Sequence, residues 1–226
     1  HPGTHFLRSE LNRGFAGGNN LGIEAALANG SEAILLLNND ASIDDRSVVS
    51  MLGTMASEDR IGTVGPTLWY GEQLLSAGGR DIARHGATHL RPDPIPTAVW
   101  DVDYVPGTVA LVGREVFDSV GPFDEDYFFG GEMADLCLRA RREGFRCVID
   151  PQARASHDLD RSSKIRDTLH VYYVYRNRFL YIRKHYPQRR ISLASIWTLR
   201  ALKAVAADLI RGRNQRAKAV WMGLSD

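Results

Sequence analysis

The chain has 226 residues, of which 44% are hydrophobic and 24% charged, and its formal net charge is +1. This composition is that of a globular protein that can bury a core. No uninterrupted apolar run reaches the length of about 18 residues that would predict a membrane span.

The charge is unevenly distributed. Between Arg176 and Lys218 the chain carries twelve Lys and Arg residues and one acid, Asp208, which leaves 16 basic and 26 acidic residues elsewhere. Such asymmetry predicts an acidic body and a basic tail that meets phosphates, of either lipid headgroups or nucleic acid.

The N-terminal half predicts strands that alternate with helices. Residues 12–20 contain many glycines and predict a turn. Apolar spacing and stop signals then predict short strands at 6–8, 33–37 and 61–64, and helices at 20–29 and 44–57. Either Ser42 or Asp44 could cap the second helix.

The C-terminal half predicts a long loop followed by more helices than strands. Residues 70–98 read as a long loop or β-excursion. The elements expected after it are a bent strand at 101–111, helices at 114–120 and 132–143, a strand at 147–150 that continues at 155–157, and helices at 166–185 and 191–211. The alternation indicates an α/β layered domain followed by a helical region of about 60 residues.

The most informative segment follows the aliphatic strand at 33–37. Asn38, Asn39 and Asp40 come directly after it. Ligands of α/β proteins bind at the carboxyl ends of strands, and Mg²⁺ and Mn²⁺ prefer oxygen ligands that they share with phosphates. Asp40 is therefore a candidate metal ligand, and Asn38 could bond to sugar or phosphate. The alternative is a simple strand-to-loop turn, which favours the same residues.

Glu132 and Asp135 form the second candidate site. They lie three residues apart at the start of a predicted helix, behind Gly130 and Gly131, so both face one side. A carboxylate there could act as a general base toward a hydroxyl group. The alternative is complementation of the helix dipole, with Asp135 paired to Arg139.

Four weaker signals remain. His157 could be a further metal contact or a structural imidazole. Gly17 and Gly18 could expose backbone N–H groups to phosphate, although their segment matches no known phosphate-loop pattern. Asp101 and Asp103 are either a solvated edge or sugar-binding carboxylates. Cys137 and Cys147 match no metal spacing and predict buried thiols in a reducing compartment.

Taken in order, seven segments resemble family 2 glycosyltransferases of the GT-A fold, most closely the bacterial rhamnosyltransferase-like group. The segments cover roughly residues 8–185 and lie at 12–20, 35–40, 76–79, 103–107, 120–125, 135–141 and 175–178. The resemblance implies a Rossmann-type mixed sheet flanked by helices. It also implies inverting transfer of a sugar from a nucleotide-diphospho-sugar to a saccharide or lipid-linked acceptor in the synthesis of cell-surface polysaccharide.

The resemblance assigns roles to residues. Asp40 takes the place of the metal-binding aspartate of the family, Asn38 the first position of its D-x-D-like motif, and His157 that of a late histidine near the metal and the diphosphate. Asn12, Gly17, Gly18, Asn38 and Asn39 are expected to contact the donor. The implied cofactor is a divalent cation, Mg²⁺ or Mn²⁺, which would stabilise the leaving diphosphate.

The chain departs from the family pattern in two ways. Met133 stands where the family commonly has its catalytic aspartate, so the role of base passes to Glu132, which we favour, or to Asp135, or is lost. The strand–helix–strand unit that usually holds the base and ribose of the donor has no counterpart before His1, so we expect a longer natural protein. A catalytically silent GT-A-like binding or scaffolding domain is the alternative.

The tail completes the expectations. We expect a catalytic domain over residues 1–165 and a helical extension over residues 166–226. Apolar residues form a stripe on its last long helix, at positions 191, 193, 196, 199, 202, 205, 209 and 210. That stripe predicts either packing on the catalytic domain or peripheral contact with the inner, cytoplasmic face of an anionic membrane. Nucleic acid is not expected as a partner.

Overall fold

The computed structural model describes residues 3–158 and 164–226, with side chains from 168 onward in the second range. The strands are β1 (Ala33–Leu37), β2 (Ala41–Ile43), β3 (Ile61–Tyr70), β4 (Gln73–Ser76), β5 (Trp100–Asp101), β6 (Val109–Gly113) and β7 (Arg146–His157). The helices are α1 (Gly14–Ala28), α2 (Asp45–Ser57), α3 (Arg114–Val120), α4 (Glu132–Arg142), α5 (Lys164–His185), α6 (Arg190–Ile210) and α7 (Asn214–Ser225), with short 3₁₀ turns at Glu125–Tyr127 and Pro187–Arg189.

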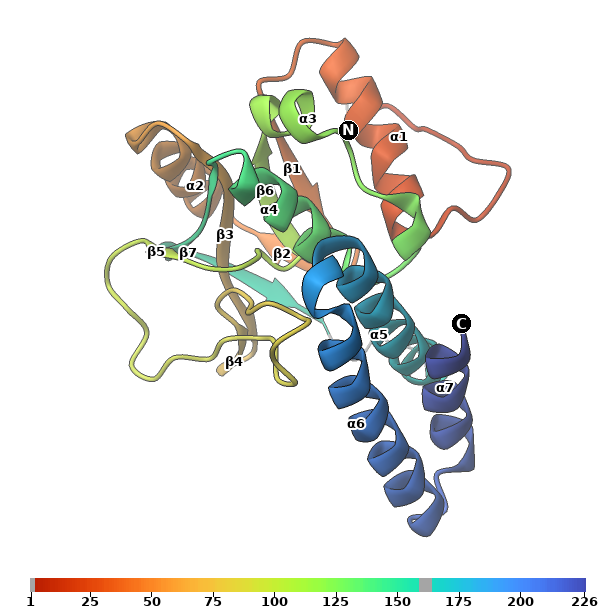
Figure 1. Cartoon of the computed structure of the whole chain (residues 1–226). Coiled ribbons are helices and arrows are strands. Elements are labelled where there is room, and N and C mark those ends of the chain that lie inside the picture. The colour runs from red at the N-terminus through yellow and green to blue at the C-terminus, as the bar shows by residue number, and fades with distance from the viewer. Residues whose placement is uncertain (1–2, 159–163) are drawn as a thin grey trace.

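The strands form one mixed sheet at the centre of the molecule, in the order β1-β6-β3-β7-β2 (Figure 1). β3 and β7 are parallel, whereas β6 runs antiparallel to both β1 and β3. β1, β3 and β7 therefore all point the same way, and their carboxyl ends meet at one edge. β1 pairs with β6 alone among the strands described, so it is an edge strand of the sheet.

The two faces of the sheet are covered by different helices. Ile34 and Leu36 on β1 join the larger core, to which α1, α3 and α4 contribute. Ala33 and Leu35 point to the other face, where the smaller core includes Met51 of α2. This alternation is the period of two that a strand imposes on its side chains, and it explains why residues 33–36 are all apolar.

The C-terminal helices stand beside the sheet (Figure 1). α5 packs against the sheet domain, since Leu180, Tyr181 and Ile182 belong to the larger core. α6 and α7 extend away from the sheet at the lower right of the figure. α7 approaches α5 closely: a Cβ on Gly223 would lie 2.5 Å from the carbonyl oxygen of Tyr172. No helix among the described residues has both the length and the apolar character needed to cross a bilayer.

Most predicted elements are confirmed, with α/β architecture, but several predicted elements and bounds are wrong. Residues 6–8 form no strand, and α1 begins at Gly14 rather than near residue 20. The bent strand expected at 101–111 is two strands, β5 on β7 and β6 between β1 and β3. The short strand expected at 61–64 continues to Tyr70.

Candidate active site

Asp40 and His157 meet at the edge where β1 and β7 end. β2 turns back after Asp40 and pairs antiparallel with the end of β7, which places Ala41 opposite His157. The N–H of Asp158 donates to the carbonyl of Asp40 at 2.8 Å and fixes this register. The imidazole Nε2 of His157 then lies 3.3 Å from a carboxylate oxygen of Asp40, with both side chains largely buried. The two predicted metal residues are thus neighbours.

This pair fits part of a divalent-cation site. A carboxylate oxygen and an imidazole nitrogen are both ligands that Mn²⁺ accepts. Within the described residues no group of three or more His, Cys, Asp or Glu side chains could hold a metal ion. A cation bound here would therefore need further ligands from phosphate oxygens and water, which is how Mg²⁺ is commonly held in phosphate-transferring sites.

Asn38 and Asn39 form the turn between β1 and Asp40. The N–H of Asn38 donates to the carbonyl of Thr108 at 3.0 Å, and its own carbonyl accepts from Ala41 at 3.1 Å. The side chain of Asn39 is exposed, and that of Asn38 is partly buried. The backbone of Asn38 thus has a structural task, and both side chains lie beside the Asp40–His157 pair along the chain.

Glu132 is a buried carboxylic acid at the first position of α4. Its side chain is 6% exposed, and Oε2 has no hydrogen-bond partner in the described part of the chain. Burial raises the pKa of Glu132 to about 7, and backbone hydrogen bonds offset this only in part. A carboxyl group with a pKa near neutrality can accept a proton from a substrate hydroxyl, which is the property of a general base.

Glu132 opens onto a cavity of about 450 Å³, here called the Glu132 cavity. Its walls come from the 82–91 loop, from Tyr104–Thr108 ahead of β6, from the start of α4 and from α5; the residues used below are His89, Arg91, Thr108, Glu132, His170 and Arg178. Thr108, whose carbonyl binds Asn38, belongs to this lining. Through Thr108 the cavity therefore adjoins the strand end that carries Asp40.

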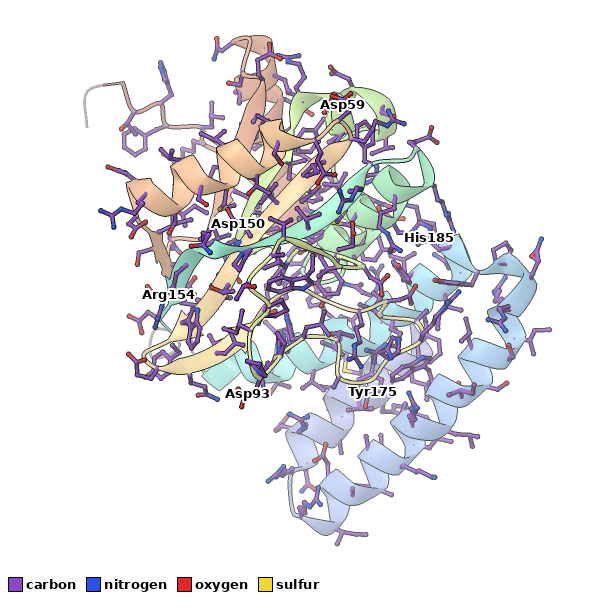
Figure 2. The ribbon with its side chains drawn as sticks, turned by 90° about the vertical axis from the view of Figure 1, so that its left-hand side faces the viewer. Asp59, Asp93, Asp150, Arg154, Tyr175 and His185 are labelled. Carbon is purple, nitrogen blue, oxygen red and sulfur yellow. The ribbon has the colours of Figure 1, made fainter. Side chains whose placement is uncertain are left out.

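Asp135 does not line this cavity. It is fully buried and forms ion pairs of 2.7 Å each with Arg139, Lys184 and His185, the last at the end of α5 (Figure 2). Burial raises the pKa of Asp135, but hydrogen bonds from His185, Lys184 and Arg139 hold it well below its usual range. The structure thus separates the two candidate bases: Glu132 faces the cavity, and Asp135 joins α4 to α5.

The glycine-rich segment is helical, so the prediction of a turn was wrong. The N–H of Gly14 donates to the side chain of Asn12, those of Phe15 and Ala16 donate to Phe128, and that of Gly17 donates to Arg13. A Cβ on Gly17 would lie 2.9 Å from the carboxylate of Glu125. Asn12 and Gly17 therefore have structural tasks here, whereas Gly18 faces open space.

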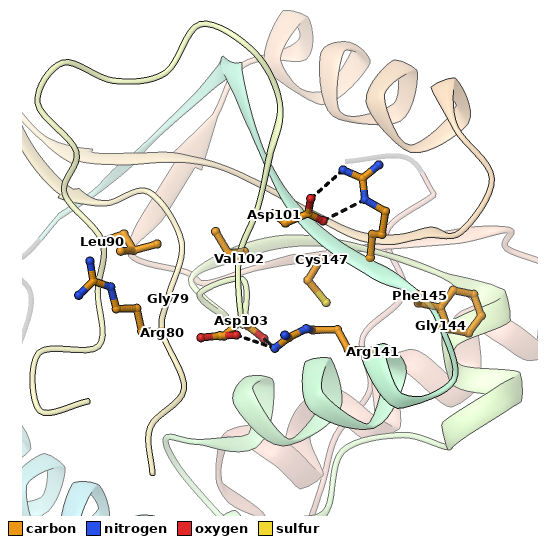
Figure 3. Close-up of a pocket in the computed structure, with 11 residues that line it drawn as sticks. Gly79, Arg80, Leu90, Asp101, Val102, Asp103, Arg141, Gly144, Phe145 and Cys147 are labelled. Atoms are coloured by element: carbon orange, nitrogen blue, oxygen red, sulfur yellow. Dashed lines mark hydrogen bonds and ion pairs between the residues drawn. The ribbon is translucent and has the colours of Figure 1, made fainter. Parts of the chain in front are cut away.

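Asp101 and Asp103 lie at a second cavity, of about 490 Å³, near the start of β7 (Figure 3). Asp101 pairs with Arg146 at 2.9 Å, and Asp103 pairs with Arg141 at 2.7 Å. His157 lies at the opposite end of β7. Both aspartates are thus engaged in ion pairs far along the strand from Asp40 and His157.

Two residues of α5 were not predicted for the site. Asn177 is buried and donates to the carbonyls of Tyr127 and Phe129, at 2.8 and 3.0 Å, and to that of Gly130. These hydrogen bonds fix the conformation of the turn that directly precedes Glu132. Arg178 lines the Glu132 cavity. Both belong to the resembling segment 175–178, but no local pattern indicates which residues their side chains reach.

Proteins named as sugar transferases resemble this chain in sequence. No family model matches the chain. The chain is 27% identical over 196 residues to the low-salt glycan biosynthesis hexosyltransferase Agl10 of Haloferax volcanii, covering 80% of this chain and 60% of that protein. It is 24% identical over 211 residues to the N-acetylglucosaminyl-diphospho-decaprenol L-rhamnosyltransferase of Mycobacterium tuberculosis, covering 83% and 68%.

The fold has solved counterparts. The mannosyltransferase PcManGT of Pyrobaculum calidifontis, solved with GDP-Man and Mn²⁺, superposes with a TM-score of 0.53 and 13% identity. The match covers 97% of this chain and 68% of that one. At this identity the likeness shows the fold, and it confirms the GT-A architecture. In sequence and in fold the chain is therefore a relative of the GT-A glycosyltransferases, within a group that includes hexosyl- and rhamnosyltransferases.

Proposed function

We propose that this chain carries the acceptor-side half of a glycosyltransferase that moves a sugar from a nucleotide-diphospho-sugar to a hydroxyl of a saccharide or lipid-linked acceptor. The observation that carries the proposal is Glu132, a buried acid with a pKa of about 7 that opens onto a cavity beside the Asp40 strand end. The hexosyl- and rhamnosyltransferase relatives support the reaction class and its place in polysaccharide synthesis.

In this mechanism Glu132 takes the proton from the acceptor hydroxyl. The acceptor oxygen then forms a bond to the anomeric carbon as the bond from that carbon to the diphosphate breaks, which inverts the configuration. The positive φ values of Gly130 and Gly131, 81° and 99°, let the chain turn into α4 directly at the carboxyl group. Asn177 fixes that turn, so Glu132 is held in place before the acceptor binds.

Asp40 and His157 are the residues that would hold a divalent cation, with Asn38 and Asn39 beside the donor. When bound, the cation would supply charge neutralisation to the leaving diphosphate. The pair supplies two ligands at most, which fits a cation that binds together with the nucleotide-sugar. In PcManGT, a protein of the same fold, GDP-Man and Mn²⁺ are bound together, which supports the general pairing of a divalent cation with a nucleotide-sugar.

Part of the donor site is expected from sequence outside this chain. The chain spans 60% of Agl10, and β1 has an open edge at which further strands can pair. We infer that such strands carry the groups that bind the base and ribose of the donor. A silent scaffolding domain is not favoured by the transferase relatives.

The test is turnover in the longest form of the protein. A panel of nucleotide-sugars is assayed for transfer or slow hydrolysis with Mn²⁺. Glu132→Gln is expected to lower kcat by about 10² to 10⁴ while donor binding is kept. Glu143→Gln, an exposed glutamate at the other end of α4, is the control. Equal activity in the wild type and Glu132→Gln would refute the proposed base.

We also infer contact between α6 and an anionic membrane surface. The buried face of α6 is formed by Trp197, Ala201 and Asp208, which leaves much of the predicted apolar stripe uncovered. Its large exposed residues are Ile191, Ile196, Leu199, Leu202, Leu209 and Ile210, at 42% to 87% exposure. Exposed basic residues flank them at positions 190, 200, 203 and 211. A basic flank beside an apolar face is typical of helices that lie in an anionic lipid surface.

A further inference from the structure

The Glu132 cavity has a cationic wall. Among the described residues Glu132 supplies the only carboxylate of its lining, whereas Arg91 and Arg178 lie on the side formed by the 82–91 loop and α5. The imidazoles of His89 and His170 line the same side, but burial lowers the pKa of His89, so that ring does not add to the positive charge at neutral pH. The electrostatic balance therefore favours an anionic group at some distance from Glu132 within the same cavity. A neutral saccharide alone does not require this arrangement.

Arg178 is the central residue of that wall. It is 6% exposed, and its guanidinium donates to the carbonyls of Ile82 at 2.7 Å and His85 at 3.4 Å. The guanidinium also stacks on the ring of Trp197, 3.6 Å from the centroid. Burial lowers the pKa of Arg178 to about 10, so the group remains charged at neutral pH.

No carboxylate of the described residues forms an ion pair with Arg178. Its hydrogen bonds go to backbone carbonyls, which do not neutralise the charge. A buried cation without a counter-ion is costly, and such groups are usually paired. The guanidinium presents planar, paired donors that match phosphate oxygens, so an anionic ligand is the natural counter-ion.

We propose that Arg178, assisted by Arg91 at the rim, binds the phosphate or diphosphate of an acceptor whose hydroxyl faces Glu132. This inference rests on the proposed function and narrows the acceptor to a phosphorylated one, such as a sugar joined to a carrier through phosphate. The diphosphate of the donor is the other possible source. We assign the subsite to the acceptor because Asp40 and His157, which in the proposed function would hold the cation of the donor diphosphate, do not line this cavity.

The experiment is calorimetric titration of the protein with inorganic pyrophosphate in the presence of a chelator, so that no divalent cation takes part. Arg178→Met is expected to raise the Kd of pyrophosphate about tenfold to a hundredfold, the loss of one charged hydrogen-bonding group. Arg91→Met is expected to raise it less. Arg183→Met, an exposed arginine on the same helix, is the control and should leave the Kd unchanged.

A second arm identifies the source of the phosphate. The protein is first saturated with Mn²⁺ and UDP, GDP or dTDP, and pyrophosphate is then added. Retained binding of pyrophosphate that depends on Arg178 supports an acceptor subsite. Complete displacement by a nucleoside diphosphate would assign Arg178 to the donor and overturn the proposal.

A second substitution at Arg178 distinguishes a folding defect from a loss of pyrophosphate binding. Arg178→Lys keeps the charge but loses the paired donors, so it should weaken pyrophosphate binding even if Arg178→Met fails to fold. An unchanged Kd in both Arg178→Lys and Arg91→Met would overturn the proposal. Pyrophosphate binding needs no turnover. The absence of such binding in the wild type therefore refutes the subsite alone, whereas absent sugar transfer with intact pyrophosphate binding refutes the proposed reaction.

Discussion

At the scale of single residues, Glu132 links the pH dependence of activity to that of stability. Its pKa is raised from 4.5 to about 7, so the active, ionised form predominates only above neutrality. We expect kcat/KM to rise with pH through about 7 and then level off. A flat profile across about pH 6–8 would speak against Glu132 as base.

The raised pKa of Glu132 also makes the free energy of unfolding depend on pH, and the direction of that dependence follows from the direction of the pKa shift. Because the folded-state pKa is the higher one, the contribution of Glu132 is fully present below pH 4.5 and is lost as pH rises through about 7. Glu132→Gln should therefore unfold at a higher temperature than the wild type at about pH 8, and with little difference at pH 4.5. Thermal melts at the two pH values measure this, and a variant less stable than the wild type at the higher pH would contradict it.

Asp135 is expected to behave in the opposite way. Its lowered pKa contributes stability above its unfolded value of 3.8, which is lost as pH falls further. Asp135→Asn leaves Arg139, Lys184 and His185 without their shared anion, so the free energy of unfolding at neutral pH should fall by about 3–5 kcal/mol. Denaturant titration measures the loss. Full stability with lost turnover would instead give Asp135 a catalytic task.

The proposed role of Asp40 as a metal ligand can be tested by comparing it with Asp44, four residues further along the chain. Asp40→Asn is expected to raise the Mn²⁺ concentration for half-maximal activity by about tenfold or more, because it removes the only carboxylate of the pair. Asp44→Asn is the control, since Asp44 caps α2 through the N–H of Ser47 and asparagine caps equally well. Equal Mn²⁺ requirements in the two variants would exclude Asp40 as a ligand.

At the scale of elements, α1 depends on one glycine. Gly14 has a φ of +68°, and a Cβ there would lie 2.3 Å from the carbonyl oxygen of Phe128. Gly14→Ala should lower the free energy of unfolding by about 2 kcal/mol or more, through strain and the lost approach of α1 to the 125–128 turn. Gly53→Ala, in open space within α2, should instead raise it by about 0.5–1 kcal/mol. Denaturant titration of both variants measures the difference.

Elements with local signals were predictable from the sequence, and those set by tertiary contacts were not. The elements that follow from periodicity and stop residues are β1, α2 and α4 before Gly144, and of the two caps proposed for α2, Ser42 and Asp44, the structure has Asp44. The start of α1 was misplaced because glycines that read as a turn instead permit close approach to Phe128 and Glu125. β2 was missed because three residues that pair with β7 carry no period of their own.

The candidate site shows the same limit. Residue types predicted Asp40, His157 and Glu132, and the structure places the first two in contact and the third in a cavity. The adjacent glycine turn favours Glu132 over Asp135 as the base, but both carboxylates lie in the first turn of α4, so the local sequence does not show which of them faces a cavity. Their roles separate only because Lys184 and His185, about fifty residues further along the chain, reach Asp135.

At the scale of the whole molecule, the exposed face of α6 predicts lipid binding. Leu199→Glu with Leu202→Glu should abolish sedimentation with phosphatidylserine vesicles, which salt should also weaken. Val49→Glu with Leu52→Glu changes a comparably exposed apolar pair on α2 and is the control. Equal sedimentation of both double variants would exclude α6 as the contact.

The free edge of β1 has a practical consequence. Five aliphatic or small residues present one row of backbone donors and acceptors with no strand beside them in the described chain, and Leu37 is 48% exposed. Such an edge can form β-sheet hydrogen bonds with another extended segment, including the same edge of a neighbouring molecule. In concentrated solution this polypeptide should thus self-associate through β1 unless another strand occupies that position first.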